Sequence, residues 1–110
     1  MDKMQHRIGV WGEETFNHTE EHLPALHKHL SEEVAELGEA IDVHLIDTME
    51  AEAVAEECAD VFILLCSIAH LCDFSLRENV ELKMGRNRAR KWGKPDKDGV
   101  IRHLSTVEGA

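Results

Sequence analysis

The chain lacks most features of membrane, secreted or disulfide-linked proteins. Its 110 residues contain no apolar run that approaches the roughly 20 residues needed to span a bilayer, so no membrane segment is expected. Residues 1–10 mix charged and apolar side chains and contain no apolar core of a signal peptide. Cys58, Cys66 and Cys72 are odd in number and form neither a CxxC nor a zinc-binding pattern. These absences favour a soluble cytoplasmic protein with reduced cysteines.

Positive charge is nearly absent from the first half of the chain. Fifteen Asp or Glu residues lie between Glu13 and Asp60, where Lys28 is the single Lys or Arg. From Lys83 to Arg102 the balance reverses, with eight Lys or Arg against two Asp. The net charge of −10 opposes attraction to free nucleic acid, which we exclude as a partner. An acidic half and a basic half together fit a small, metal-chelated polyphosphate.

The spacing of the apolar residues predicts three long helices and an all-α fold. The first is expected from about Pro24 to Val43 and the second from about Met49 to Leu71. The third begins at a capping box near Ser75 and ends near Trp92. Within the second helix, residues 61–72 are apolar nearly all round, which is more surface than a two-helix hairpin covers. We therefore expect an antiparallel helical bundle whose core is completed by oligomerisation.

The chain is short enough that one domain over residues 1–110 is expected. Residues 1–23 contain two glycines and mixed polarity, and we predict a loop or short-helix arm there. Residues 24–92 form the predicted helical core. Residues 93–110 begin with a turn-rich stretch and are predicted to form a tail that pairs briefly or packs as an arm.

Two clusters of carboxylates give the strongest indication of chemistry. Glu32, Glu33 and Glu36 lie on the first predicted helix, and Glu57 and Asp60 lie on the second. Carboxylates three residues apart share a helix face and repel one another unless a cation lies between them. If the two helices pack antiparallel, the clusters face each other and form an oxygen-rich site. Such a site suits Mg²⁺, with Mn²⁺ as a substitute ion.

A basic face on the third predicted helix complements the acidic clusters. Lys83, Asn87 and Arg90 are spaced at i, i+4 and i+7, so they share one face. We expect this face to bind phosphate oxygens while the metal screens the charge that develops on a polyphosphate under attack. A carboxylate such as Glu32 or Glu56 could receive the proton of the attacking water. These features predict phosphoanhydride hydrolysis.

Two alternatives come from other classes of protein. A non-catalytic nucleotide-binding or regulatory interaction protein could keep the same metal cluster for structure or sensing. A di-iron carboxylate bundle requires Glu-x-x-His motifs, and no glutamate of the two clusters has a histidine three residues later. Imidazole also suits softer metals than magnesium, and His27 and His29 cannot share a helix face, so we expect no histidine among the ligands.

Three motifs follow one another along the chain: Glu32-Glu33-x-x-Glu36, Glu57-x-x-Asp60 and Lys83-x-x-x-Asn87-x-x-Arg90. In this order they resemble the all-α nucleoside triphosphate pyrophosphohydrolases of the MazG and dimeric dUTPase superfamily. The ending around Trp92 and the arm from Trp11 to Phe16 look closest to its small MazG-like and dATP/dGTP diphosphohydrolase-like members. The resemblance extends over about residues 11–104.

The resemblance implies a magnesium-dependent enzyme that cleaves a ribo- or deoxyribonucleoside triphosphate to the monophosphate and pyrophosphate, in nucleotide-pool house-cleaning. It also implies a homodimer or homotetramer in which neighbouring subunits complete the core and the pocket. By position it implies metal ligands at Glu33, Glu36, Glu57 and Asp60, phosphate or sugar contacts at Lys83, Asn87 and Arg90, and base stacking on Trp11 and Phe16.

Overall fold

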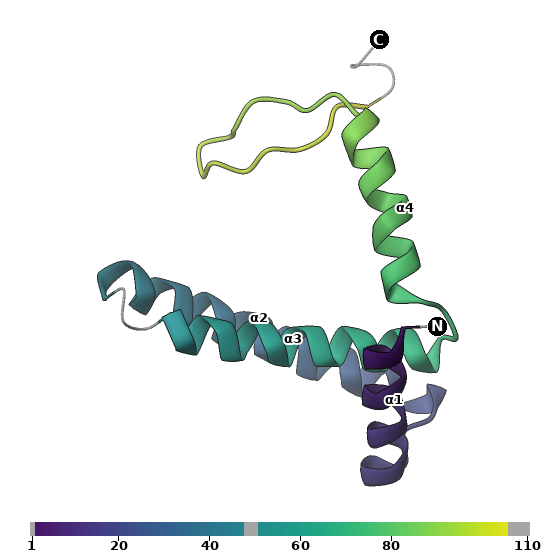
Figure 1. Ribbon diagram of the computed structural model, residues 1–110. Coiled ribbons are helices and arrows are strands. Elements are labelled where there is room, and N and C mark those ends of the chain that lie inside the picture. The colour runs from purple at the N-terminus through teal and green to yellow at the C-terminus, as the bar shows by residue number, and fades with distance from the viewer. Residues whose placement is uncertain (1, 48–50, 106–110) are drawn as a thin grey trace. The chain divides into compact units, whose positions relative to one another are not determined.

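The computed structural model describes residues 2–47 and 51–105, and this part of the chain is helical (Figure 1). The all-α prediction is confirmed, since the described residues contain isolated bridge pairing and no strand. They pack in two compact units, divided between Leu76 and Arg77. The elements are α1 (Lys3–Phe16), the 3-10 turn η1 (Glu20–His22), α2 (Leu23–Ile46), α3 (Ala51–Leu71) and α4 (Leu76–Ala89).

The helices α2 and α3 lie side by side and form the hairpin on which the first unit is built (Figure 1). The expected first helix is confirmed, although α2 continues three residues further, to Ile46. The expected start of the second helix at Met49 lies outside the described residues, and α3 ends at Leu71 as predicted. Leu26 of α2 and Leu64 of α3 are buried in the hairpin.

The N-terminal segment forms a regular helix instead of the predicted loop or short-helix arm. The carboxylate of Asp2 caps α1 by accepting hydrogen bonds from the backbone N–H groups of Met4 and Gln5. Gly9 lies within this helix and does not break it. Its missing side chain permits close packing against a neighbouring helix. A Cβ at Gly9 would lie 2.1 Å from Cγ of His70. The missing side chain therefore lets α1 approach α3.

Polar contacts fix α1 against the end of α3 and the turn that follows it. The imidazole of His70 pairs with the carboxylate of Glu13. The buried side chain of Gln5 donates from Nε2 to the carbonyl of Phe74 at 2.7 Å. Its Oε1 accepts from the backbone N–H of Leu76 at 2.8 Å, so both polar atoms of this buried amide are satisfied.

The end of α3 is closed by a left-handed residue. Asp73 has φ of 58°, its N–H donates to the carbonyl of His70, and the N–H of Phe74 donates to the carbonyl of Ala69. This pair of bonds is the Schellman arrangement, which satisfies the last carbonyls of a helix. Cys66 and Ala69 are buried where α1 and α2 cover different sides of α3, so the expectation of burial on more than one side is confirmed.

A single chain leaves part of the apolar surface of the hairpin uncovered. Val34 and Ile41 of α2 remain exposed. Phe62 and Leu65 of α3 are also exposed. Among the described residues, no single helix is both long and apolar enough to cross a membrane, and α3 and α4 satisfy that test only in combination.

The second unit contains most of α4 and the C-terminal tail. The helix ends at Ala89, and Trp92 lies in an antiparallel bridge with His103. This confirms the brief pairing expected of the tail. The turn between the paired segments is stabilised by Asp96, whose carboxylate accepts from Asp98 N, Val100 N and the Arg102 guanidinium. These bonds hold the pKa of Asp96 below its usual range, the bond from Arg102 being the largest cause.

The contact between Gly9 and His70 predicts a cost for any side chain at position 9. Gly9→Ala is expected to lower the free energy of unfolding by about 1–3 kcal/mol, because the new Cβ overlaps the imidazole ring. Urea unfolding followed by circular dichroism measures the change. A Cβ at Gly85 in α4 meets nothing within 4 Å, so Gly85→Ala is the control and should gain about 0.5–1 kcal/mol. Equal effects of the two substitutions would contradict the close packing of α1 on α3.

Candidate active site

Three of the predicted metal ligands come together between α2 and α3. Glu33 and Glu36 are three residues apart on α2, and Glu57 faces them from α3. One carboxylate oxygen from each lies within 4.8 Å of the others. We call these three residues the acidic cluster. Its formation requires the hairpin, because the two segments of sequence are twenty residues apart.

The acidic cluster is electrostatically unfavourable on its own. Oε2 of Glu33 and Oε2 of Glu57 are buried and have no hydrogen-bond partner. Desolvation raises the pKa of Glu57 to about 7, helped by a hydrogen bond with Glu33 and by the charges of Glu36, Glu33 and Asp60. A hydrogen bond with Glu33, and then its charge, raises the pKa of Glu36. Glu36 and Glu57 therefore hold a proton more readily than an isolated glutamate does, because repulsion among the carboxylates of the cluster disfavours the charged forms.

The donor set fits a hard divalent cation. All ligand atoms are carboxylate oxygens, which are what magnesium and manganese prefer. The two buried, unpartnered oxygens of Glu33 and Glu57 are vacant acceptors that a cation would satisfy. A cation would also favour the deprotonated carboxylates, because it stabilises the charged form of each.

Asp60 and Glu32 are not part of the acidic cluster. Asp60 is one turn beyond Glu57 and lines the neighbouring pocket together with Glu33, and it is not among the three closely grouped residues. Its charge still reaches Glu57, whose pKa it helps to raise. Glu32 is exposed and lies outside the group. Of the four predicted ligands, Glu33, Glu36 and Glu57 are therefore grouped, and Asp60 lies in the wall of the adjoining pocket.

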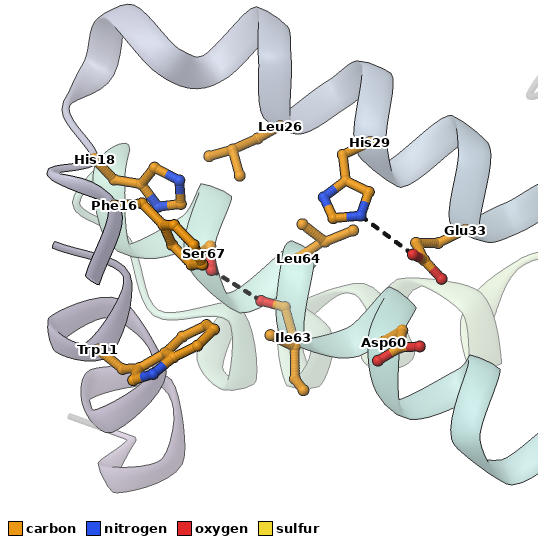
Figure 2. Close-up of a pocket in the computed structure, with 10 residues that line it drawn as sticks. All are labelled: Trp11, Phe16, His18, Leu26, His29, Glu33, Asp60, Ile63, Leu64 and Ser67. Carbon is orange, nitrogen blue, oxygen red and sulfur yellow. Dashed lines mark hydrogen bonds and ion pairs between the residues drawn. The ribbon is translucent and has the colours of Figure 1, made fainter. Parts of the chain in front are cut away.

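A pocket of about 350 Å³ adjoins the acidic cluster within the first unit (Figure 2). That volume is in the range of small-molecule sites. Glu33 and Asp60 lie on one side of it, and aromatic rings from α1 lie on the other. The predicted stacking residues Trp11 and Phe16 are therefore brought to the same pocket as two predicted ligands. The lining residues are Trp11, Phe16, His18, Leu26, His29, Glu33, Asp60, Ile63, Leu64 and Ser67.

His29 contacts the cluster, although the sequence analysis placed no histidine in the site. Its Nε2 lies 3.2 Å from Oε1 of Glu33, one helical turn away on α2 (Figure 2). The i, i+4 spacing of His29 and Glu33 was the signal that could have indicated this pair. The contact engages one oxygen of Glu33 and leaves the buried Oε2 for a cation.

Lys83, Asn87 and Arg90 belong to the second unit. α4 carries the first two, and Arg90 follows its last turn. Nη1 of Arg90 donates to Oδ1 of Asn87 at 3.2 Å, and the backbone carbonyl of Asn87 accepts from the indole N–H of Trp92 at 2.9 Å. The exposed Lys83 and this fixed pair share a helix face, as their spacing predicted.

Comparison with known proteins identifies the fold and the chemistry. A family model for the MazG nucleotide pyrophosphohydrolase domain matches residues 21–91. The chain is also similar to the solved structure of a cyanophage S-2L MazG-like pyrophosphohydrolase, bound to dGDP and three catalytic Mn²⁺ ions per active site. The sequences are 25% identical, the TM-score is 0.56, and the alignment covers 98% of this chain and 95% of that chain. A sequence search of curated proteins gives no match.

The raised pKa of Glu57 predicts that the metal-free protein loses stability as pH rises. The unfolded chain releases this proton near 4.5 and the folded chain near 7, so between these values the unfolded state binds fewer protons. The free energy of unfolding is therefore expected to fall from about pH 4.5 to 7. Above about pH 7, Glu57 should contribute little further change. Thermal unfolding in a chelator, followed from pH 4 to 8, measures this.

Two variants distinguish the effect of Glu57 titration from that of the other carboxylates of the chain. Glu57→Gln should flatten the fall in melting temperature between pH 4.5 and 7, because it cannot ionise. Glu56→Gln removes the neighbouring exposed carboxylate and should leave the fall in place. A flat profile in the parent protein, or the same profile in all three proteins, would contradict the electrostatic description of the cluster.

Proposed function

The chain belongs to the MazG nucleotide pyrophosphohydrolase family, and on that premise we propose that it cleaves a nucleoside triphosphate to the monophosphate and pyrophosphate. Family membership makes it a hydrolase that acts on nucleotide phosphoanhydride bonds. The observation that carries the proposal is the acidic cluster at the edge of the aromatic pocket. This arrangement offers a metal-binding end for phosphates and an apolar end for a base.

Magnesium is the proposed cofactor, and Glu33, Glu36, Glu57 and Asp60 are the proposed ligands. The carboxylate chemistry of these residues supports this choice, as do the catalytic Mn²⁺ ions of the cyanophage enzyme. Manganese is expected to substitute. Bound metal supplies charge screening for the phosphates and a more acidic attacking water.

The remaining roles are assigned to side chains of this chain. We propose Glu32 as proton acceptor, since its exposed carboxylate can pass a proton on to solvent. Lys83, Asn87 and Arg90 are proposed to hold phosphate or sugar oxygens, with Arg90 oriented by its bond to Asn87. Trp11 and Phe16 are proposed to stack on the base (Figure 2). The dGDP in the cyanophage enzyme supports a nucleotide in such a pocket.

Oligomerisation is proposed from the uncovered face of the hairpin. Val34 and Ile41 on α2, with Phe62 and Leu65 on α3, leave large apolar side chains in water. A homodimer or homotetramer would bury them. Sedimentation equilibrium should therefore give at least a dimer at micromolar concentration, and Phe62→Asp should shift it toward monomer. A parent protein that sediments as a stable monomer would contradict this proposal.

Product analysis tests the proposed reaction. The protein is incubated with Mg²⁺ and a panel of ribo- and deoxyribonucleoside triphosphates, and monophosphate, diphosphate, pyrophosphate and phosphate are resolved. We expect equal amounts of monophosphate and pyrophosphate from a subset of the panel, and no product in a chelator. Release of diphosphate and phosphate would contradict the proposed bond. Nucleotide binding without turnover would favour the non-catalytic alternative.

Variants then separate the metal ligands from the phosphate contacts. Glu36→Gln and Asp60→Asn should each lower kcat by about a hundredfold or more, because each weakens the charge that holds the metal. Lys83→Ala should mainly raise KM for triphosphates, by about tenfold. Glu52→Gln, which removes an exposed carboxylate from the first turn of α3, is the control and should match the parent. Full turnover by the Asp60→Asn variant would exclude Asp60 as a metal ligand.

A further inference from the structure

The aromatic end of the pocket holds one polar side chain that the proposed function leaves without a role. Trp11 and Phe16 pack edge to face, with ring centroids 5.1 Å apart. The imidazole of His18 continues the row, with its centroid 5.2 Å from that of Phe16. All three line the same pocket (Figure 2). We call these three residues the ring cluster.

The backbone places His18 in this position. Asn17 has φ of 55°, which ends α1 and turns the chain back sharply, and Asn17 N–H donates to the carbonyl of Glu13. Gly12 leaves the space that the imidazole uses, since a Cβ there would lie 2.8 Å from Nδ1 of His18. On the other side, the ring of His22 lies 5.7 Å away. The ring is thus held from several directions.

The nitrogens of His18 remain available for a ligand. Within the described residues, neither ring nitrogen has a hydrogen-bond partner, whereas His29 is paired with Glu33 and His22 accepts from Thr19 N–H. Among the other neutral polar groups of the pocket, the indole N–H of Trp11 is a donor only, and the hydroxyl of Ser67 already donates to the carbonyl of Ile63. Its proton is therefore engaged, while the His18 ring has both a donor and an acceptor to offer.

The charge state of His18 suits recognition of a neutral group. Burial, and then the charge of His22, lower the pKa of His18 from its ordinary value of 6.5. At neutral pH the ring is therefore uncharged and presents one N–H donor and one nitrogen acceptor. A nucleobase edge carries the same two kinds of group, whereas a phosphate would favour a cation.

The exposure of the aromatic rings also indicates a ligand. The side chains of Trp11 and Phe16 are 51% and 52% exposed, although they stand at the mouth of a pocket with an apolar wall. A planar base stacked on them would cover this surface. Such a base would have its edge near His18, at the opposite side from Glu33 and Asp60 (Figure 2).

We propose that His18 is a specificity-determining residue that reads the edge of the nucleobase by hydrogen bonding while the base stacks on the ring cluster. The inference rests on the proposed function, because it takes a nucleoside triphosphate as the ligand. It adds that base selectivity resides in the segment after α1 and not in the acidic cluster. Loss of the imidazole nitrogens should therefore alter the choice of base and not the metal requirement.

The test compares base preference in matched variants. kcat/KM is measured with Mg²⁺ for each triphosphate of the panel in the parent, His18→Phe, His18→Gln and the control His27→Gln. His18→Phe keeps a ring but loses both nitrogens, and His27 is an exposed residue outside the pocket lining. We expect His18→Phe to compress the ratio between the best and the worst base by about tenfold or more. His18→Gln should change the order of preference, and His27→Gln should leave it unchanged.

Several outcomes would overturn the proposal. An equal loss for every base in both His18 variants would indicate a structural role, and an unchanged ratio would exclude base reading. Equal kcat/KM values for all bases in the parent protein would also contradict a role of His18 in base selection. Failure of the proposed function is separate, since then no triphosphate yields monophosphate and pyrophosphate at all.

A second readout does not depend on the folding of any variant. The ring ¹⁵N signals of His18 in the parent protein are followed while metal-free deoxynucleosides are added. We expect shifts with the base that is the best substrate and smaller shifts with the worst, with His27 signals unmoved. Identical responses of His18 and His27 to every nucleoside would overturn the proposal even if all variants were unstable.

Discussion

The structure depends on three carboxylates being held closer together than their charges favour. Glu33 and Glu57 each bury an oxygen without a partner, and the two helices that carry them also form the hairpin core. That core is small, because the buried apolar side chains of the described residues are those of Leu26, Leu64, Cys66 and Ala69. A cation that binds only the folded site would stabilise it by mass action. A cation bound by these carboxylates would therefore couple metal binding to the folding of the hairpin.

Glu33 links the two ends of the site. One of its oxygens contacts His29, the other is buried and unpartnered, and its side chain also lines the pocket that extends to the rings of α1. The acidic cluster stands on α2 and α3, whereas Trp11 and Phe16 are supplied by α1. The contacts that join α1 to α3, such as the pairing of Glu13 with His70, do not involve the three carboxylates. The carboxylates and the aromatic rings of the pocket are thus supplied by different helices.

The sequence predicted the parts that depend on periodicity. The hairpin helices and the grouped carboxylates follow from spacing along the chain, and the pairing of the tail follows from its turn-rich residues. The features that the sequence did not predict depend on contacts between residues that are not adjacent in the chain. Gly9 was interpreted as a helix breaker because a sequence cannot show that His70 would occupy the space of its side chain. His18 gave no signal either, since its position follows from the left-handed turn at Asn17 and from the gap at Gly12.

The exposed half of the α2 stripe shows why periodicity alone does not define a core. A stripe at helical spacing includes Leu26, which is buried against α3, and Val34 and Ile41, which are not. A spacing of three and four residues spreads apolar side chains over more of the helix surface than one partner helix contacts. On α3 the same excess appears at Phe62 and Leu65. Because Phe62 and Leu65 follow Glu57 and Asp60 on the same helix, a partner that covers them would also hold the helix that carries these two proposed ligands.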